Sequence, residues 1–465
     1  MSATAVPPPD FAAEPQPDHR LGLAATVALV VGGIVGTGIF TVPAAVADYG
    51  WLTVPAFVVV GLGSVAIALS FAGLVRRTRR SGGPYVYADD AFGPFAGFLA
   101  AWTYWIQGWT GHATISVAGA GYLASLLGAG GGRGTTTALA AIILVLPVLN
   151  NLVGTRSVGA AVVVTTVLKI TALTIVAVVG LVLFDGGNVG PVHAHGGNVG
   201  SALPAACALL LFSFLGMEGA AVATNRVQAP QRNVPRAIVA GVVGVGVLYL
   251  ASTLAVQGTV PQNELSQSSA PFADAARALF GGDWAAKTIA AVAVLSALGS
   301  LNGWNLVNAE MVAGASRDGF FPPVFARRTR GLPVLALLTN SALAVLLIVL
   351  NAAGDALSLF TTLALLSTFV YVFGYVLSVA AQLLHVLLEG GPRPPPGPAV
   401  VALVALAFSI WMAGAAGPGA VRSGTVLVLL GVPAYVFTRW RAARRRPPDQ
   451  PGSDLVRLAS NGLRE

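Results

Sequence analysis

GGIVGTGIFTVP, residues 32–43, interrupts an apolar run that begins near Leu21 and continues past Ala47. The length of this run is typical of a helix that crosses a membrane, which needs roughly 20 apolar residues. Gly36-Thr37-Gly38 breaks the pattern near its middle, because glycine weakens the interior of a helix. The sequence therefore predicts a spanning helix that is broken inside the membrane.

The composition extends the membrane prediction to the whole chain. Of its 465 residues, 55% are hydrophobic and 9% are charged, and the mean hydropathy is +0.77. A water-soluble domain cannot leave that much apolar surface exposed. The apolar runs lack the alternation that barrel strands require, so we expect an all-α polytopic membrane protein. We count twelve spans, at about residues 23–46, 53–75, 94–127, 137–153, 158–183, 203–225, 236–257, 284–312, 334–352, 357–387, 399–416 and 422–438.

The distribution of the 24 Arg and 2 Lys residues predicts the orientation in the membrane. With the N-terminus in the cytoplasm, 21 of these residues fall on the cytoplasmic side, 4 fall on the other side, and Lys169 lies inside a span. Both termini are therefore expected in the cytoplasm, with the chain in the inner cell membrane. The net charge of +8 then marks the cytoplasmic face rather than a nucleic-acid partner. RWRAARRR at 439–446 is expected to meet the headgroups of the lipid bilayer.

Residue types that hold metals or carry out hydrolysis are scarce. Cys207 is the only cysteine, which excludes an intrachain disulfide and a cysteine-rich metal site. The sequence contains no Walker A loop, no HExxH and no GxSxG. We therefore expect no cofactor, no metal site and no enzymatic activity.

A second interruption, SFLGMEG at 213–219, falls in the sixth apolar run, about 180 residues after the first. Paired interruptions five spans apart predict an inverted-repeat transporter whose substrate binds between the broken helices. Repeat one would cover about residues 21–184 and repeat two about 202–388, with two extra helices at about 398–440. The transporter domain, 21–440, would lie between a disordered N-terminal tail (1–20), which lacks the basic segment of a signal peptide, and a basic cytoplasmic tail (441–465).

A helix break at the middle of a membrane has a physical cost. It frees backbone N–H and C=O groups that lipid cannot satisfy, so it is tolerated only where it lines a polar cavity. The amides after the break carry the positive end of a helix dipole and can bind a carboxylate. Alternatively, Gly32, Gly36 and Gly38 only allow helices to pack closely. The stretch by itself leaves both interpretations open.

Four motifs occur in order along the chain: GTGIF at 36–40, GGPYVYADDAFGPFAGF at 82–98, FSFLGMEGAAVATNRVQAPQRNVPRAI at 212–238 and GSLNGWNLVNAEMVAGASRDGFFPPVFAR at 299–327. Together they resemble the amino acid–polyamine–organocation (APC) superfamily of transporters. Within it, spans one to ten are most similar to the basic amino acid/polyamine antiporter group, which includes arginine/agmatine exchangers. The resemblance implies a LeuT-like fold of five plus five inverted spans with two extra helices. Antiporters of this group are often dimers, so a homodimer is one expected assembly.

The resemblance also implies roles for individual residues. Backbone amides of the GTGIF stretch would bind the α-carboxylate of an amino acid, and carbonyls of the broken sixth span would bind its α-amino group. Phe212 would cover the substrate, and the hydroxyl of Ser367 would meet its side chain. The substrate-binding residues implied in this way are Gly36, Thr37, Gly38, Ile39, Phe212, Ser213, Leu215, Gly216 and Ser367. Tyr104, Trp304 and Tyr375 match gating residues, as does Phe212, although each aromatic ring is also compatible with plain packing.

Two charged residues lie inside predicted spans, where such groups are costly and usually functional. The resemblance implies that Glu218 takes part in proton sensing and gating. It also implies that Lys169 fills the space that sodium occupies in sodium-coupled relatives, so both residues are expected to serve proton coupling. The alternatives are a structural hydrogen-bonding carboxyl for Glu218 and a lysine that snorkels to the cytoplasmic surface for Lys169.

The chain departs from the arginine/agmatine exchangers at the substrate. His112 replaces an asparagine near the guanidinium group and Gln107 replaces a small residue nearby; both are expected to contact the substrate. A protonated histidine would repel a cationic side chain, so neutral or polar amino acids become at least as suitable. Asn225-Arg226 replaces acids found in many relatives. Glu310 has no assigned role, although it could pair with Lys169 if the helix faces agree.

We therefore expect a secondary active transporter that carries an amino acid or amine by alternating access, through exchange or proton-coupled uptake. Its partners would be the small-molecule substrate, protons and the lipid bilayer, with no nucleic acid. A sodium-coupled symporter is the alternative within transport, which Lys169 disfavours, and paired helix breaks favour a carrier over a channel. A nutrient sensor built on a transporter fold is the alternative from another class.

Overall fold

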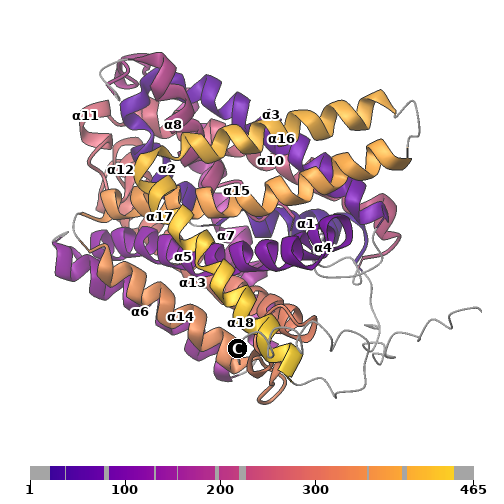
Figure 1. The fold of residues 1–465 in the computed structure, drawn as a ribbon. Helices are drawn as coiled ribbons and strands as arrows, with labels where there is room; N and C mark the ends of the chain where they lie inside the picture. The colour runs from indigo at the N-terminus through magenta and orange to yellow at the C-terminus, as the bar shows by residue number, and fades with distance from the viewer. Residues whose placement is uncertain are drawn as a thin grey trace, which may run out of the picture.

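The computed structural model describes residues 21–36, 38–77, 83–129, 132–153, 156–193, 198–218, 227–352, 355–389 and 395–444. Within these ranges every regular element is a helix, and the β-bridges are isolated pairs such as Leu21 with Val227 (Figure 1). The predicted all-α fold is confirmed.

Most of the predicted spans coincide with helices that are long and apolar enough to cross a membrane. Eight described segments meet that test: η1 with α3 (Ala47–Leu52, Thr53–Arg77), α6 (Arg133–Val153), α7 (Arg156–Val182), α10 (Pro230–Thr259), α13 (Asp283–Arg317), α15 (Ala356–Glu389), α16 (Pro396–Ala415) and α17 with α18 (Gly417–Leu429, Gly431–Arg444). The pair α1 (Leu23–Ile34) and α2 (Gly38–Ala45) forms a ninth when counted as one bent span. Three further predicted spans fall on α5 (Pro94–Leu127), α8 (Val199–Phe212) and α14 (Val334–Leu350). The polytopic membrane protein is confirmed, whereas the count of twelve and the five-plus-five repeat stay predictions.

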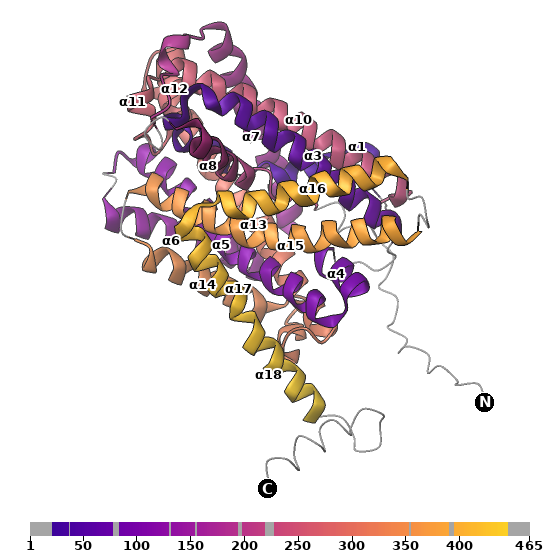
Figure 2. The ribbon, with the colours of Figure 1, turned by 45° about the horizontal axis from the view of Figure 1, so that its top comes forward.

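The longest helices form the centre of the bundle. α5 packs along α13 and α15. α6 and α14 also lie against α5. α3, α7, α8 and α10 pack beside them, and α18 projects from the bundle (Figure 2). Alanine and glycine on these helices allow close contact; a Cβ at Gly119 of α5, for example, would lie 2.8 Å from the Ala297 methyl of α13.

Short helices close the two ends of the bundle. At one end α4 (Pro84–Phe92) precedes α5, and both helices start with proline after a glycine of positive φ, Gly83 and Gly93. Proline at the first helical position fits because its missing N–H has no partner there. At the other end lie η2 (Gly186–Asn188), α11 (Gln262–Leu265) and α12 (Pro271–Phe280), while η5 (Pro323–Ala326) follows α13. Figure 2 shows α4 and the α11–α12 pair on opposite sides of the molecule.

α5 passes from one end to the other and serves as an axis for the site. Tyr104 lies toward the α4 end, residues 107–115 lie in the middle, and Tyr122 lies toward the α12 end. At 1.5 Å per residue, Tyr104 and Tyr122 are roughly 27 Å apart along the helix. Tyr104, residues 107–115 and Tyr122 therefore mark three levels along α5: the α4 end, the middle and the α12 end.

Candidate functional site

The first span is broken where the sequence predicts it. α1 ends at Ile34, α2 begins at Gly38, and their axes differ by 49°. Tyr249 of α10 donates a hydrogen bond to the Ile34 carbonyl at 3.1 Å, so a neighbouring helix satisfies one freed acceptor. The amides of the first turn of α2 have no acceptor within their own helix. Thr37 lies outside the described residues, and its predicted role stays a prediction.

The sixth span also leaves its helix where the sequence predicts. α8 ends at Phe212, and residues 213–218 continue as turns in which Phe214 N–H donates to Leu211 O at 2.9 Å. Gly216 has φ +95°, a conformation that side chains disfavour. A Cβ there would lie 2.7 Å from Trp304 Cζ2 and 2.9 Å from Gly33 O. Glycine is therefore required for Trp304 and α1 to approach this break.

The two breaks meet at a small pocket of about 40 Å³. They touch directly, since a Cβ at Gly38 would lie only 2.8 Å from Phe212 Cε1. Predicted site residues that line the pocket are Gly36, Gly38, Ile39, Gln107, His112, Phe212, Ser213, Leu215 and Trp304. The structure thus brings together predicted residues from four helices and from both helix breaks, and Gly216 adjoins them through Trp304.

The wall of the pocket formed by α5 and α13 is polar. Asn308 Nδ2 lies 3.4 Å from His112 Nε2, and a Cβ at Gly108 would overlap the Asn308 amide, so the two helices are in close contact here. Gln107 Oε1 and Asn308 Oδ1 are buried and accept no hydrogen bond within the described residues, and the same holds for the Ser213 hydroxyl. Buried polar atoms are normally hydrogen-bonded, so these three atoms lack the partner that is expected of them.

Sequence reasoning missed Asn308 and Tyr249. Asn302, Asn305 and Asn308 recur every three residues in an otherwise apolar run, which places amides along one side of α13. That spacing could have indicated a polar helix face. Nothing in the sequence around Tyr249 marks it, because its role depends on a carbonyl 215 residues away.

Ser367 does not line the pocket. It is fully buried, and its hydroxyl lies 3.5 Å from that of Thr114 on α5. Its predicted contact with a substrate side chain stays a prediction, and the structure gives it a protein partner instead.

The predicted gating residues on α5 and α15 belong to a buried aromatic cluster at the α4 end of the pocket. Tyr371 lies between them, with ring centroids 5.8 Å from Tyr104 and 4.8 Å from Tyr375. Tyr375 also contacts Phe71 of α3, which in turn contacts Tyr87 of α4. We call Tyr104, Tyr371, Tyr375 and Phe71, together with Glu218, the α4-end cluster.

Glu218 joins this cluster through a hydrogen bond. The Tyr375 hydroxyl donates to Glu218 Oε2 at 2.8 Å, and the Glu218 side chain is fully buried. Glu218 Oε1 accepts no hydrogen bond within the described part of the chain. Tyr375, predicted for gating, and Glu218, predicted for proton coupling, are therefore in direct contact.

Lys169 of α7 is 1% exposed, and its ammonium lies 3.4 Å from the Ser300 hydroxyl of α13. Its side chain is thus directed into the bundle and does not snorkel to the surface. The expected pair with Glu310 is wrong, because Glu310 forms a bidentate ion pair with Arg328 at 2.6 and 2.9 Å. The physical reason is position: Glu310 is only partly buried, near the end of α13, whereas Lys169 contacts the same helix at Ser300, ten residues earlier.

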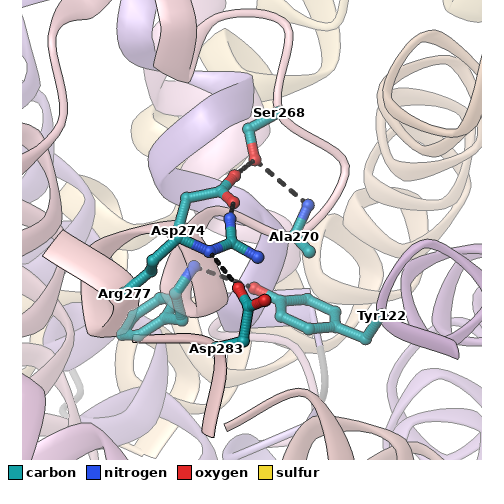
Figure 3. Close-up of polar contacts among 7 residues, drawn as sticks. Tyr122, Ser268, Ala270, Asp274, Arg277 and Asp283 are labelled. Carbon is teal, nitrogen blue, oxygen red and sulfur yellow. Dashed lines mark hydrogen bonds and ion pairs between the residues drawn. The ribbon is translucent and has the colours of Figure 1, made fainter. Parts of the chain in front are cut away.

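Toward α12, Tyr122 of α5 joins the first span to α12, a contact that sequence reasoning also missed. Its hydroxyl donates to Phe40 O of α2 at 2.6 Å and accepts from Phe272 N of α12 at 3.1 Å. Figure 3 shows Tyr122 beside a cluster in which Arg277 pairs with Asp274 and Asp283, and Ser268 joins Asp274 to Ala270 N. The broken first span is thereby tied to α12. We call Tyr122, Phe40 and Phe272 the α12-end closure.

Comparisons with known proteins agree with this architecture. Residues 21–432 match the model of the amino acid permease family. The putrescine transporter PotE of Escherichia coli (strain K12) is 30% identical over 433 residues, which cover 90% of this chain and 95% of that protein. PotE of Haemophilus influenzae is 29% identical over 437 residues, covering 91% and 98%. The cadaverine/lysine antiporter of Escherichia coli (strain K12) is 30% identical over 356 residues, covering 73% and 77%.

These matches cover both helix breaks and every helix that lines the pocket, from α1 to α13. The relatives are transporters of amino acids and polyamines, so the resemblance carried by the four motifs is confirmed. The chain belongs to the amino acid permease family, and it is a multi-pass secondary transporter and not an enzyme.

Proposed function

We propose that this protein carries an amino acid or its decarboxylated amine across the cytoplasmic membrane by alternating access. The substrate binds in the pocket between the two helix breaks, and its passage requires the α12-end closure and the α4-end cluster to open in turn. Both termini lie in the cytoplasm, so α12 faces the outside and α4 the cytoplasm.

The observation that carries this proposal is the meeting of the two breaks. Gly38 and Phe212 touch, and the surrounding pocket holds buried polar atoms that have no protein partner within the described residues. Helix packing alone explains small residues, but it does not explain unpaired amides and a hydroxyl beside two irregular segments. A polar ligand at this point satisfies the freed groups.

Glu218 provides a means of proton coupling. Its buried carboxyl is held by Tyr375 at the α4 end, and a proton gained or lost there changes the hydrogen bond that joins α15 to the second break. Lys169, buried against Ser300 beside the first span, supports transport without sodium.

The test is transport by the purified protein in liposomes. Labelled amino acids and diamines are offered outside, with or without unlabelled substrate inside, an inward proton gradient, or sodium. Uptake only with internal substrate establishes exchange, and uptake driven by the gradient establishes proton symport. A requirement for sodium contradicts the role given to Lys169. If the whole panel fails to move or bind, the transport proposal is wrong and a sensor becomes the better explanation.

A further inference from the structure

We propose that the pocket selects α-amino acids with a neutral, hydrogen-bonding side chain over diamines and cationic amino acids, and that Asn308 and Gln107 make this selection. The inference rests on the proposed function and concerns the same pocket. It separates this chain from the relatives described above, which are named for putrescine, cadaverine and lysine.

The first argument is the distribution of carboxylates. Every Asp and Glu between residues 21 and 444 lies in the described ranges, and only Glu218 among them is buried. Glu218 does not line the pocket, and one of its oxygens is already hydrogen-bonded to Tyr375. A diamine carries two ammonium groups, so at least one would be buried without a counter-charge, which is unfavourable in a protein interior.

The second argument concerns the positive charge already present. The N-terminus of α2, at Gly38, presents the positive end of a helix dipole to the pocket. This dipole favours an anionic group in the ligand and disfavours an additional cation. An α-amino acid brings its own carboxylate, which compensates its ammonium, whereas a diamine does not.

The third argument is the wall that meets the substrate side chain. Gln107 and Asn308 are at least nine-tenths buried, line the pocket, and leave amide oxygens unpaired within the described residues. Neutral amide oxygens accept hydrogen bonds from a carboxamide or a hydroxyl without burying a net charge. The other end of the Asn308 amide lies 3.4 Å from His112 Nε2. A side chain such as that of glutamine, asparagine or serine satisfies this wall.

The experiment measures binding rather than transport. The purified protein is titrated with glutamine, asparagine, serine, lysine and putrescine, and the dissociation constants come from calorimetry, with ligand-induced shifts in melting temperature as a second readout. We expect at least about tenfold tighter binding of glutamine or asparagine than of lysine or putrescine, since one unsatisfied buried polar group is worth about 1–3 kcal/mol. Equal or tighter binding of putrescine overturns the inference while leaving the transport proposal intact.

A pair of matched variants tests the wall itself. Asn308→Asp supplies the missing carboxylate, so lysine and putrescine should gain affinity about tenfold and glutamine should lose it. Asn305→Asp is the control, because Asn305 is equally buried on the same helix but does not line the pocket. Gln107→Glu repeats the test on α5 in case Asn308→Asp does not fold.

The outcomes separate the two levels of the proposal. If neither pocket variant changes the order of preference, or if Asn305→Asp changes it equally, Asn308 and Gln107 do not select the substrate. If the wild-type protein binds none of the five ligands, the proposed function fails together with the inference. Leucine is titrated as a further control. If it binds as tightly as glutamine, the pocket selects only against charge, and the hydrogen-bonding role of the wall is wrong.

Discussion

The two ends of the pocket are closed by different chemistry. At the α12 end, the Tyr122 hydroxyl is fully used by the backbone of Phe40 and of Phe272, and no titratable carboxyl takes part in the buried contact. At the α4 end, a single buried carboxyl, Glu218, holds Tyr375 and keeps one oxygen unpaired within the described residues. One end is therefore held by packing and neutral hydrogen bonds, whereas the other contains a carboxyl group that can bind or release a proton.

This difference predicts that the α12-end closure and the α4-end cluster open in response to different events. Neutral backbone contacts keep the same strength across the physiological pH range, so we expect the α12-end closure to open when ligand binding moves α2. The strength of the contact at the α4 end changes with the protonation of Glu218. Variants at the second helix break, at each end of the pocket, and outside both ends test this contrast between the two ends.

The largest effect is expected at Gly216, where the second helix break lies against α1 and Trp304. Gly216→Ala places a Cβ 2.7 Å from Trp304 and 2.9 Å from Gly33 O at a φ of +95°. Such strain costs of the order of 1–3 kcal/mol, and the pocket must deform, so uptake and substrate binding should fall about tenfold or more. Proteoliposome uptake and calorimetric binding measure the loss.

A matched control is available on a neighbouring helix. Gly244 of α10 has no heavy atom within 4 Å of its ideal Cβ position, so Gly244→Ala should leave uptake and binding unchanged. If the two alanine variants behave alike, the close approach at the second break is not needed for transport.

The next effect should be confined to the α4 end. Glu218→Gln keeps a hydrogen-bond acceptor for Tyr375 but removes the titratable group. Gradient-driven uptake should fall about tenfold or more and lose its dependence on pH, because hydrogen bonds to a charged group exceed neutral ones by about 1 kcal/mol and the proton no longer has a site. Exchange at constant pH should persist.

Tyr375→Phe separates the proton from the hydrogen bond. It removes the donor and keeps both the carboxyl and the ring contacts with Phe71 and Tyr371. Uptake should therefore slow but remain dependent on pH. Unchanged pH dependence in Glu218→Gln would show that another group carries the proton, with Lys169 as the next candidate.

A smaller effect is expected at the α12 end. Tyr122→Phe removes the hydrogen bonds to Phe40 O and from Phe272 N but keeps the ring contacts. The loss should be about 1–3 kcal/mol in the stability of the closed end, with no change in the pH dependence of uptake.

Cys207 is the only cysteine and is buried, so labelling of Ser213→Cys reports water access to the pocket. Labelling should become several-fold faster in Tyr122→Phe, and an equal labelling rate would argue against the closure.

Sequence patterns predicted much of this architecture, for identifiable reasons. Both helix breaks are visible because glycines and a glutamate interrupt apolar runs, and their consequences are local: the chain leaves its helix at Ile34 and at Phe212. Most pocket-lining residues that the resemblance implied follow from the same two stretches. Family motifs therefore locate residues well when their role depends on the local conformation of the backbone.

Tertiary contacts between distant segments were not predictable in the same way. Tyr122, Tyr249 and Asn308 act on groups 82 to 215 residues away, so no local pattern marks them. The pair proposed for Glu310 failed for the same reason. Two charges on neighbouring spans satisfy a sequence argument, but the depth of each residue along its helix decides which charge it meets.

The smallest effect is expected at that misassigned pair, outside both closures. Glu310 and Arg328 are about one third exposed, and an ion pair so close to water contributes about 0.2–1 kcal/mol. Glu310→Gln should therefore lower the melting temperature by no more than a few degrees and leave both uptake and its pH dependence unchanged. Lys169→Ala is the contrasting variant, because it empties a buried position against Ser300 beside the broken first span. If Glu310→Gln impairs transport as strongly as Lys169→Ala, the charges at the end of α13 belong to the α4-end gate, and proton control there involves more than Glu218.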